Sequence, residues 1–160
     1  MKLLVIDDDA KLADALARGL RSEGFTVDVA TDGDDGLWMA REAEYDALIV
    51  DVMLPHRDGF QICDELRRAD DWTPILMLTA RDDELAETRS LGIVADDFMT
   101  KPYSLPVLVA HIRSIARRRQ HCDTVATVVG DLRIDPVSRR VWSSGSEVTL
   151  TCREFDVLEF

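Results

Sequence analysis

The residues with the clearest chemical potential stand directly after short apolar runs of the sequence. They are three consecutive carboxylates, a fourth carboxylate, a hydroxyl and an ammonium: Asp7-Asp8-Asp9, Asp51, Thr79 and Lys101. Carboxylates that are crowded together repel one another, and some of their pKa values rise unless a divalent cation joins them. Mg²⁺ suits such a set, because it prefers carboxylate oxygens, a carbonyl, waters and a phosphate oxygen.

An aspartate beside such an ion can attack a phosphoryl donor and hold the group as an acyl phosphate. Lys101 would neutralise phosphoryl charge, and the Thr79 hydroxyl would hydrogen-bond it. No Ser/His/Asp or Cys/His spacing indicates another nucleophile, and there is no Walker loop. Each residue alone is weak evidence, and Asp9 is expected only to cap a helix that starts at residue 10. The interpretation depends on all of these residues following predicted strands.

The elements that must position these residues alternate between strand and helix patterns. Strands are predicted at residues 3–6, 25–30, 47–50, 75–78 and 97–100, and helices near 10–20, 34–43, 60–66, 83–92 and 105–115. Five such units imply right-handed crossovers and a parallel sheet. We expect an α/β fold with a doubly wound, five-stranded, flavodoxin-like sheet, in which the carboxyl ends of the strands bring the candidate residues to one edge.

The pattern changes after the fifth unit. Residues 1–118 are predicted to form the first domain, and the polar residues 119–126 a linker. Over residues 127–160, short apolar segments separated by turn residues are typical of antiparallel hairpins. The run from Thr151 to Glu154 predicts a capping box that opens a helix with Phe155 and Leu158 inward. The chain stops inside that helix, so this second domain is expected to be incomplete.

Composition limits the function classes. The net charge is −12, which argues against a chain that coats nucleic acid or an anionic membrane. Most of it lies in residues 1–118, where 14 Lys/Arg face 24 Asp/Glu. No apolar run approaches the ~20 residues of a membrane helix, and the N-terminus lacks the form of a signal peptide. We therefore expect a cytoplasmic protein without membrane contact, in which the three cysteines are reduced thiols.

Several segments resemble a known family. LVIDDD, YDALIVDVMLPHRDGF, PILMLTAR and ADDFMTKPY are similar to the receiver domains of OmpR/PhoB-type two-component response regulators. GDLRID, RRVW and LTCREFDVL resemble the start of the winged-helix effector domain of that family. The resemblance implies a regulator that is phosphorylated by a sensor histidine kinase, switches conformation, forms a homodimer and controls transcription by binding promoter DNA. It implies no enzymatic activity beyond phosphotransfer to, and hydrolysis from, its own aspartate.

The resemblance also implies a role for each site residue. Asp51 is the phosphoacceptor, and Mg²⁺ is bound by Asp8 directly, by Asp7 through water, by Asp51 and by the carbonyl of Met53. Thr79 and Lys101 bind the phosphoryl group, and Thr79 and Phe98 form the switch. The peptide between Lys101 and Pro102 is expected to be cis.

Some positions depart from the family pattern. Val94 stands where the family has glycine, which predicts a reshaped turn. Glu87, Val107 and His111 replace residues of the family's dimer salt bridges, although Asp97 and Arg113 remain. A dimer formed through residues 83–115 is therefore expected to be more apolar and less salt-sensitive than the family norm.

Two other interpretations fit part of the sequence. Haloacid-dehalogenase-like phosphatases also place D-x-D after a first strand, and Asp7 would be their nucleophile. That interpretation leaves Asp51 unexplained and finds no acidic motif after Lys101. A stand-alone receiver that acts by protein contact would fit residues 1–118 but not the hairpin pattern that follows. On the favoured interpretation, promoter binding needs the complete effector domain, and this chain alone is not expected to bind a specific DNA site.

Overall fold

A computed structural model describes residues 1–80, 95–121, 127–135, 140–148, 150, 155, 157 and 158. The chain divides into two compact units, Met1–Ala116 and Arg117–Phe160. Three predictions lie outside the described residues: the helix near 83–92 with Glu87, the turn at Val94, and the capping box at 151–154.

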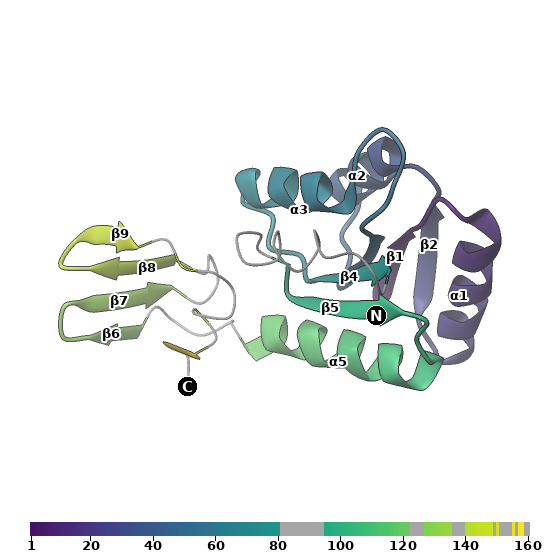
Figure 1. Ribbon diagram of the computed structural model, residues 1–160. Helices are drawn as coiled ribbons and strands as arrows, with labels where there is room; N and C mark the ends of the chain where they lie inside the picture. Colours follow the sequence, from purple (N-terminus) through teal and green to yellow (C-terminus); the bar gives the residue numbers. More distant parts are fainter. Residues whose placement is uncertain are drawn as a thin grey trace. The chain divides into compact units, whose positions relative to one another are not determined.

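The first unit contains a five-stranded parallel sheet (Figure 1). Its strands are β1 (Lys2–Ile6), β2 (Thr26–Ala30), β3 (Ala47–Asp51), β4 (Ile75–Ala80) and β5 (Asp97–Lys101). Their order is β2-β1-β3-β4-β5, and every neighbouring pair is parallel. The three central strands are apolar and buried, as expected for a sheet that is covered on both faces. The predicted doubly wound fold is confirmed.

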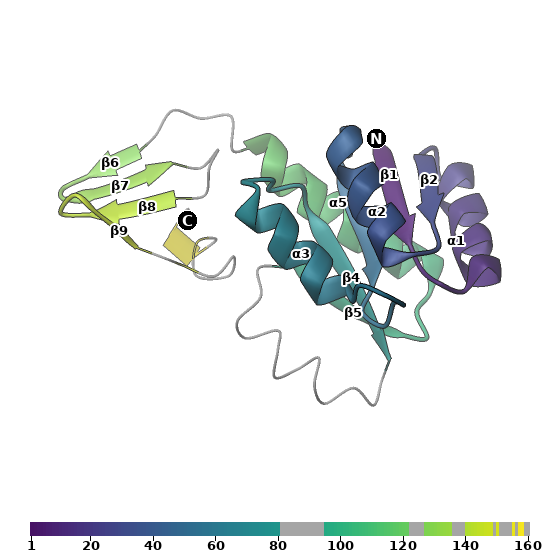
Figure 2. The same ribbon diagram turned by 90° about the horizontal axis from the view of Figure 1, so that it is seen from above.

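Four described helices cover the two faces of the sheet (Figure 2). They are α1 (Ala10–Ser22), α2 (Gly33–Glu42), α3 (Gly59–Arg68) and α5 (Leu105–His121). Helices α1 and α5 share one apolar cluster with the sheet, and α2 and α3 share another. Because successive side chains of a strand point to opposite faces, Met99 of β5 joins the first cluster and Phe98 packs against the second.

Aspartates begin three of these helices. The side chain of Asp9 accepts hydrogen bonds from the backbone of Lys11 and Leu12 at 3.0 and 3.1 Å, which confirms the predicted cap of α1. Asp32 caps α2 in the same way. Asp58 forms a capping box with Gln61, in which each side chain accepts a hydrogen bond from the other residue's backbone. Each cap sets the residue at which a loop ends and the next helix begins.

Helix α5 extends beyond its predicted end. It continues to His121, so residues 119–121, which were predicted to open the linker, are helical. Arginine and glutamine favour helices even without an apolar period, and basic side chains are favourable near a helix C-terminus. Periodicity therefore underestimated the length of this helix.

The second unit contains a four-stranded sheet in the order β6-β7-β8-β9. The strands are β6 (Thr127–Val129), β7 (Leu132–Asp135), β8 (Arg140–Ser143) and β9 (Ser146–Val148), and they pair antiparallel, as the hairpin pattern predicted. Phe155 is buried against Ile134 and Val141. The prediction that Leu158 also points inward is wrong, because its side chain is exposed. Positions three residues apart share one side of a helix but differ by about 60° around the axis, so Leu158 can lie at the margin of the face that buries Phe155.

Among the described residues, no helix combines the length and apolar character needed to cross a membrane.

Candidate functional site

The carboxyl ends of the parallel strands meet at one edge of the first sheet. The chain passes from β1 through α1 to β2, whereas β3 lies on the other side of β1, so the direction of winding reverses between β1 and β3. Ligands of doubly wound sheets bind at such a switch point. Asp7 follows β1, Asp51 ends β3 and Lys101 ends β5.

Three carboxylates converge at this edge. One oxygen from each of Asp7, Asp8 and Asp51 lies within 4.8 Å of the other two. Asp7 and Asp51 are buried, with 1% and 7% of their surface exposed, while Asp8 is exposed. Burial raises the pKa of Asp51, although its bonds to Lys101 oppose the shift. The pair of buried acids is therefore costly unless positive charge offsets it.

The ammonium of Lys101 lies between the two buried acids. Its Nζ donates to Asp51 Oδ2 at 2.6 Å and to Asp7 Oδ2 at 2.9 Å. Burial alone would lower the pKa of Lys101, but the bonds to both carboxylates outweigh burial and raise it. The other oxygens of these acids accept backbone hydrogen bonds, Asp7 Oδ1 from Asp9 and Asp51 Oδ1 from Met53, at 3.0 and 3.2 Å.

The charge and donor types of this group fit a small, hard divalent cation. Among the described residues, three carboxylates face one ammonium, which leaves a net negative charge within this group. Oxygen donors at this spacing are those that Mg²⁺ prefers, and an exposed Asp8 leaves an open side for water or a phosphate oxygen. The residues present are thus compatible with the predicted magnesium site.

Two hydroxyl groups belong to the same region. Thr79 ends the buried part of β4, and its hydroxyl donates to the carbonyl of Ala80 at 3.3 Å, a long and weak bond. The hydroxyl of Tyr103, two residues after Lys101, is buried without a hydrogen-bond partner in the described part of the chain. Burial raises the pKa of this phenol. Sequence analysis did not single out Tyr103, because a tyrosine after a proline carries no distinctive spacing.

The loop that follows Asp51 is held against the start of α2. His56 Nδ1 lies 2.6 Å from Asp32 Oδ2, and Arg57 Nε donates to Asp34 Oδ1 at 2.7 Å. His56 has a φ of 63°, a conformation in which histidine is among the few tolerated side chains. Gly33 has no room for a side chain, since a Cβ there would overlap the carbonyl oxygen of Arg57. We call residues 52–58 the acidic-site loop.

His56 also forms a second possible cation group with Asp32 and Asp34. The two aspartates already contact His56 and Arg57 of the acidic-site loop. They also lie at the N-terminus of α2, where the helix dipole disfavours a cation. This group is therefore better explained as a pair of ionic contacts than as a metal site.

Four of the predicted site residues form one contact group, Asp7, Asp8, Asp51 and Lys101. Met53 joins through its backbone N–H, and its side chain is 67% exposed. Phe98 packs beside Phe60 of α3. The peptide between Lys101 and Pro102 is cis, as the resemblance implied.

The arrangement defines a class of α/β domain, the receiver of two-component signalling. The family model of the response regulator receiver domain matches residues 3–113. The chain therefore belongs to the response regulator family. Its resemblance to OmpR/PhoB-type regulators is confirmed by relatives that align with the whole chain.

Three curated relatives illustrate the similarity. The transcriptional regulatory protein TcrA of Mycobacterium tuberculosis is 42% identical over 99% of this chain and 63% of its own length. The response regulator MprA of Mycobacterium ulcerans is 40% identical, with 99% and 71% covered. The transcriptional activator protein IrlR of Burkholderia pseudomallei is 41% identical, with 99% and 69% covered. The chain thus spans slightly less than two thirds of TcrA.

Solved structures give the same result. The receiver domain of Francisella response regulator 1452 superposes with a TM-score of 0.68 at 32% identity, over 73% of this chain and 97% of that one. A RitR variant superposes with a TM-score of 0.79 at 29% identity, over 98% and 70%. The receiver domain of the histidine kinase PA1611 from Pseudomonas aeruginosa, with magnesium coordinated in its active-site cleft, has a TM-score of 0.68 at 25% identity, over 72% and 97%.

Proposed function

We propose that this chain receives a phosphoryl group on Asp51 from a phosphohistidine of a sensor histidine kinase, and that the complete protein thereby controls transcription. The observation that carries the proposal is the buried Asp51 carboxylate, which shares the Lys101 ammonium with Asp7 at the switch point of a receiver fold. The names of TcrA and IrlR, a transcriptional regulatory protein and a transcriptional activator, support control of transcription.

In the proposed transfer, an oxygen of Asp51 forms a bond to phosphorus while the bond from phosphorus to the histidine nitrogen of the kinase breaks. The electron pair of the broken bond stays on the imidazole. Lys101 neutralises charge on the transferred group, and Thr79 exchanges its weak bond to Ala80 for one to a phosphoryl oxygen. Hydrolysis of the acyl phosphate at the same site ends the signal.

Magnesium would be held by Asp8, Asp51 and the carbonyl of Met53, with Asp7 bound through water. Bound there, it would neutralise charge on the phosphoryl oxygens during the transfer. The exposed position of Asp8 and the burial of Asp7 agree with these two modes of binding.

The proposed switch begins at Thr79 and ends at the face formed by β5 and α5. As the Thr79 hydroxyl moves toward the phosphoryl group, Phe98 is free to turn inward. The face that includes residues 83–115 then repacks and dimerises. In the complete protein, a winged-helix domain that begins near residue 127 would bind promoter DNA, and residues 122–126 would link the two domains.

Peptide mapping after incubation with acetyl phosphate and Mg²⁺ tests the proposal. We expect the label on Asp51, and its loss in Asp51→Asn or in the presence of EDTA. Asp35→Asn is the matched control, because Asp35 is an exposed carboxylate outside the acidic group, and it should label normally. A label on Asp7, or labelling that survives in Asp51→Asn, would support the phosphatase interpretation and contradict ours.

A further inference from the structure

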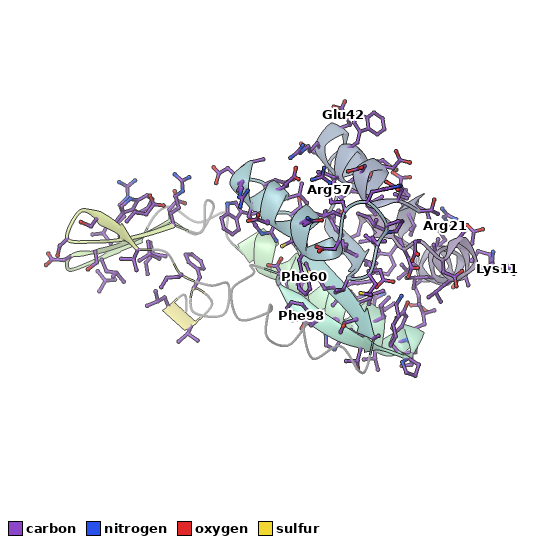
Figure 3. All side chains as sticks on the ribbon, turned by 45° about the horizontal axis from the view of Figure 1, so that its top comes forward. Lys11, Arg21, Glu42, Arg57, Phe60 and Phe98 are labelled. Carbon is purple, nitrogen blue, oxygen red and sulfur yellow. The ribbon has the colours of Figure 1, made fainter. Side chains whose placement is uncertain are left out.

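The ring of Phe98 has an aromatic neighbour in α3. The ring centroids of Phe60 and Phe98 are 6.4 Å apart, and the ring planes are inclined by 41° (Figure 3). This is a tilted pair within the range in which aromatic rings attract one another. Phe60 is buried, whereas Phe98 is only partly buried on the edge strand β5. The partly buried ring of Phe98 therefore packs against the buried ring of Phe60.

Phe60 is fixed with respect to the backbone of Asp51. Its neighbour Gly59 donates its N–H to the carbonyl of Val52 at 3.0 Å. A Cβ on Gly59 would overlap the carbonyl oxygen of Asp51, so the start of α3 lies in direct contact with the strand end that carries the carboxylate. The capping box of Asp58 and Gln61 holds this first turn rigid.

A short chain of contacts thus leads from Asp51 through the first turn of α3 to Phe98. It is separate from Thr79, which belongs to β4. Interior packing is dense, so a displacement of the Asp51 backbone is transmitted to residues packed against it. One end of this route is the contact between the rings of Phe60 and Phe98. The other end is the backbone contact of Gly59 with Asp51 and Val52.

We infer that Phe60 is a positioning residue that sets the conformation of Phe98 and couples it to the state of Asp51. The inference rests on the proposed function, because it takes Phe98 as the switch residue. The tilted pair stabilises the ring position seen here, so its loss should shift the ring equilibrium of Phe98 away from that position. An aromatic pair of ordinary strength corresponds to a shift of roughly 2- to 10-fold.

Fluorine NMR of the whole chain labelled with fluorophenylalanine tests this role. The chain has five phenylalanines, and the Phe98 signal is assigned by its loss in Phe98→Leu. We expect Phe60→Leu to move the Phe98 signal and to reduce its response to beryllofluoride with Mg²⁺. Phe25→Leu, the same change in the cluster on the opposite face of the sheet, should leave both unchanged.

Phe60 is a core residue, and Phe60→Leu could lower stability enough to unfold the chain. Phe60→Met nearly conserves the volume of the side chain but removes the ring, and should give the same change in the Phe98 signal. If Phe98 responds to beryllofluoride in these variants as it does in the unsubstituted chain, the inference is wrong and the proposed switch stands. If Phe98 does not respond in the unsubstituted chain, the proposed switch itself fails.

Discussion

At the scale of single residues, one ammonium partly offsets the charge of the acidic group in the described structure. Lys101 bonds to Asp7 and Asp51 together, which offsets one of the three negative charges at the strand ends. The remaining charge is unfavourable by itself, and the proposed magnesium ion would offset it. In the proposed transfer, Lys101 would stay beside the charge as it moves from the Asp51 carboxylate to the phosphoryl group.

The contact between His56 and Asp32 predicts a pH dependence of stability. The Asp32 carboxylate raises the pKa of His56, and the imidazole lowers the pKa of Asp32. The contribution of His56 is present in full below its unfolded pKa of 6.5 and is lost as the pH rises through the raised value. The contribution of Asp32 is present above 3.8 and is lost as the pH falls through the lowered value. The pair is therefore most stabilising between these limits.

Urea unfolding of the unsubstituted chain and of His56→Asn, at about pH 5.5 and about pH 8.5, measures this effect. Asparagine also tolerates the positive φ, so the variant removes the charge without adding backbone strain. We expect the difference in unfolding free energy to be larger at the lower pH, and Asp32→Asn to behave alike. An equal difference at both values would show that the ion pair contributes nothing.

At the scale of elements, the sequence predicted the sheet and the edge at which the site forms. The buried strands β1, β3 and β4 are short apolar runs bounded by polar residues, and their length favours a buried strand over a helix. The sequence did not predict that the acidic-site loop would bind α2. That contact joins side chains 24 and 23 residues apart in the sequence, and a local pattern does not report on such pairs.

Gly33 is the position at which this packing can be tested. Gly33→Ala places a methyl group against the carbonyl of Arg57, so the acidic-site loop must move away from α2. We expect a loss of about 1–3 kcal/mol in unfolding free energy and slower labelling of Asp51, since Met53 belongs to the same loop.

Gly19→Ala in α1 is the matched control for Gly33→Ala. The added methyl would meet only the flexible end of the Leu105 side chain, and alanine favours the helix. Its stability should change little, and its labelling should match the unsubstituted chain. Slower labelling in both variants would mean that the effect does not come from the acidic-site loop.

At the scale of the whole molecule, the two units differ in net charge. The acidic excess lies mainly in residues 1–118, where part of it forms the site. The sequence predicted both sheets, since each has its own periodicity. It predicted the linker less well, because α5 continues into it. The sequence did not predict side-chain pairings between elements. His111 of α5, noted only as a departure from the family, lies 2.6 Å from Asp97 of β5.

That pairing bears on the proposed dimer. Asp97 is bound by His111, and the Arg113 guanidinium lies 3.9 Å from Glu23 and over the ring of Phe25. In the described part of this face, Asp97 and Arg113 are thus already engaged within one chain, while Val107 is 50% exposed. We expect the beryllofluoride-activated chain to dimerise through an apolar contact. Sedimentation should give the same dimer fraction in about 0.05 M and about 0.5 M salt, because screening weakens only charged contacts.

Val107→Ser should shift the activated chain toward monomer, since it removes apolar surface from the proposed contact. Val128→Ser is the matched control, because Val128 is a valine of similar exposure, 65%, on β6 of the second unit. It should leave the dimer fraction unchanged. A dimer that dissociates at the higher salt would mean that Asp97 or Arg113 leaves its partner to form intermolecular ion pairs. A monomer under every condition would remove residues 83–115 as the dimer contact of this chain.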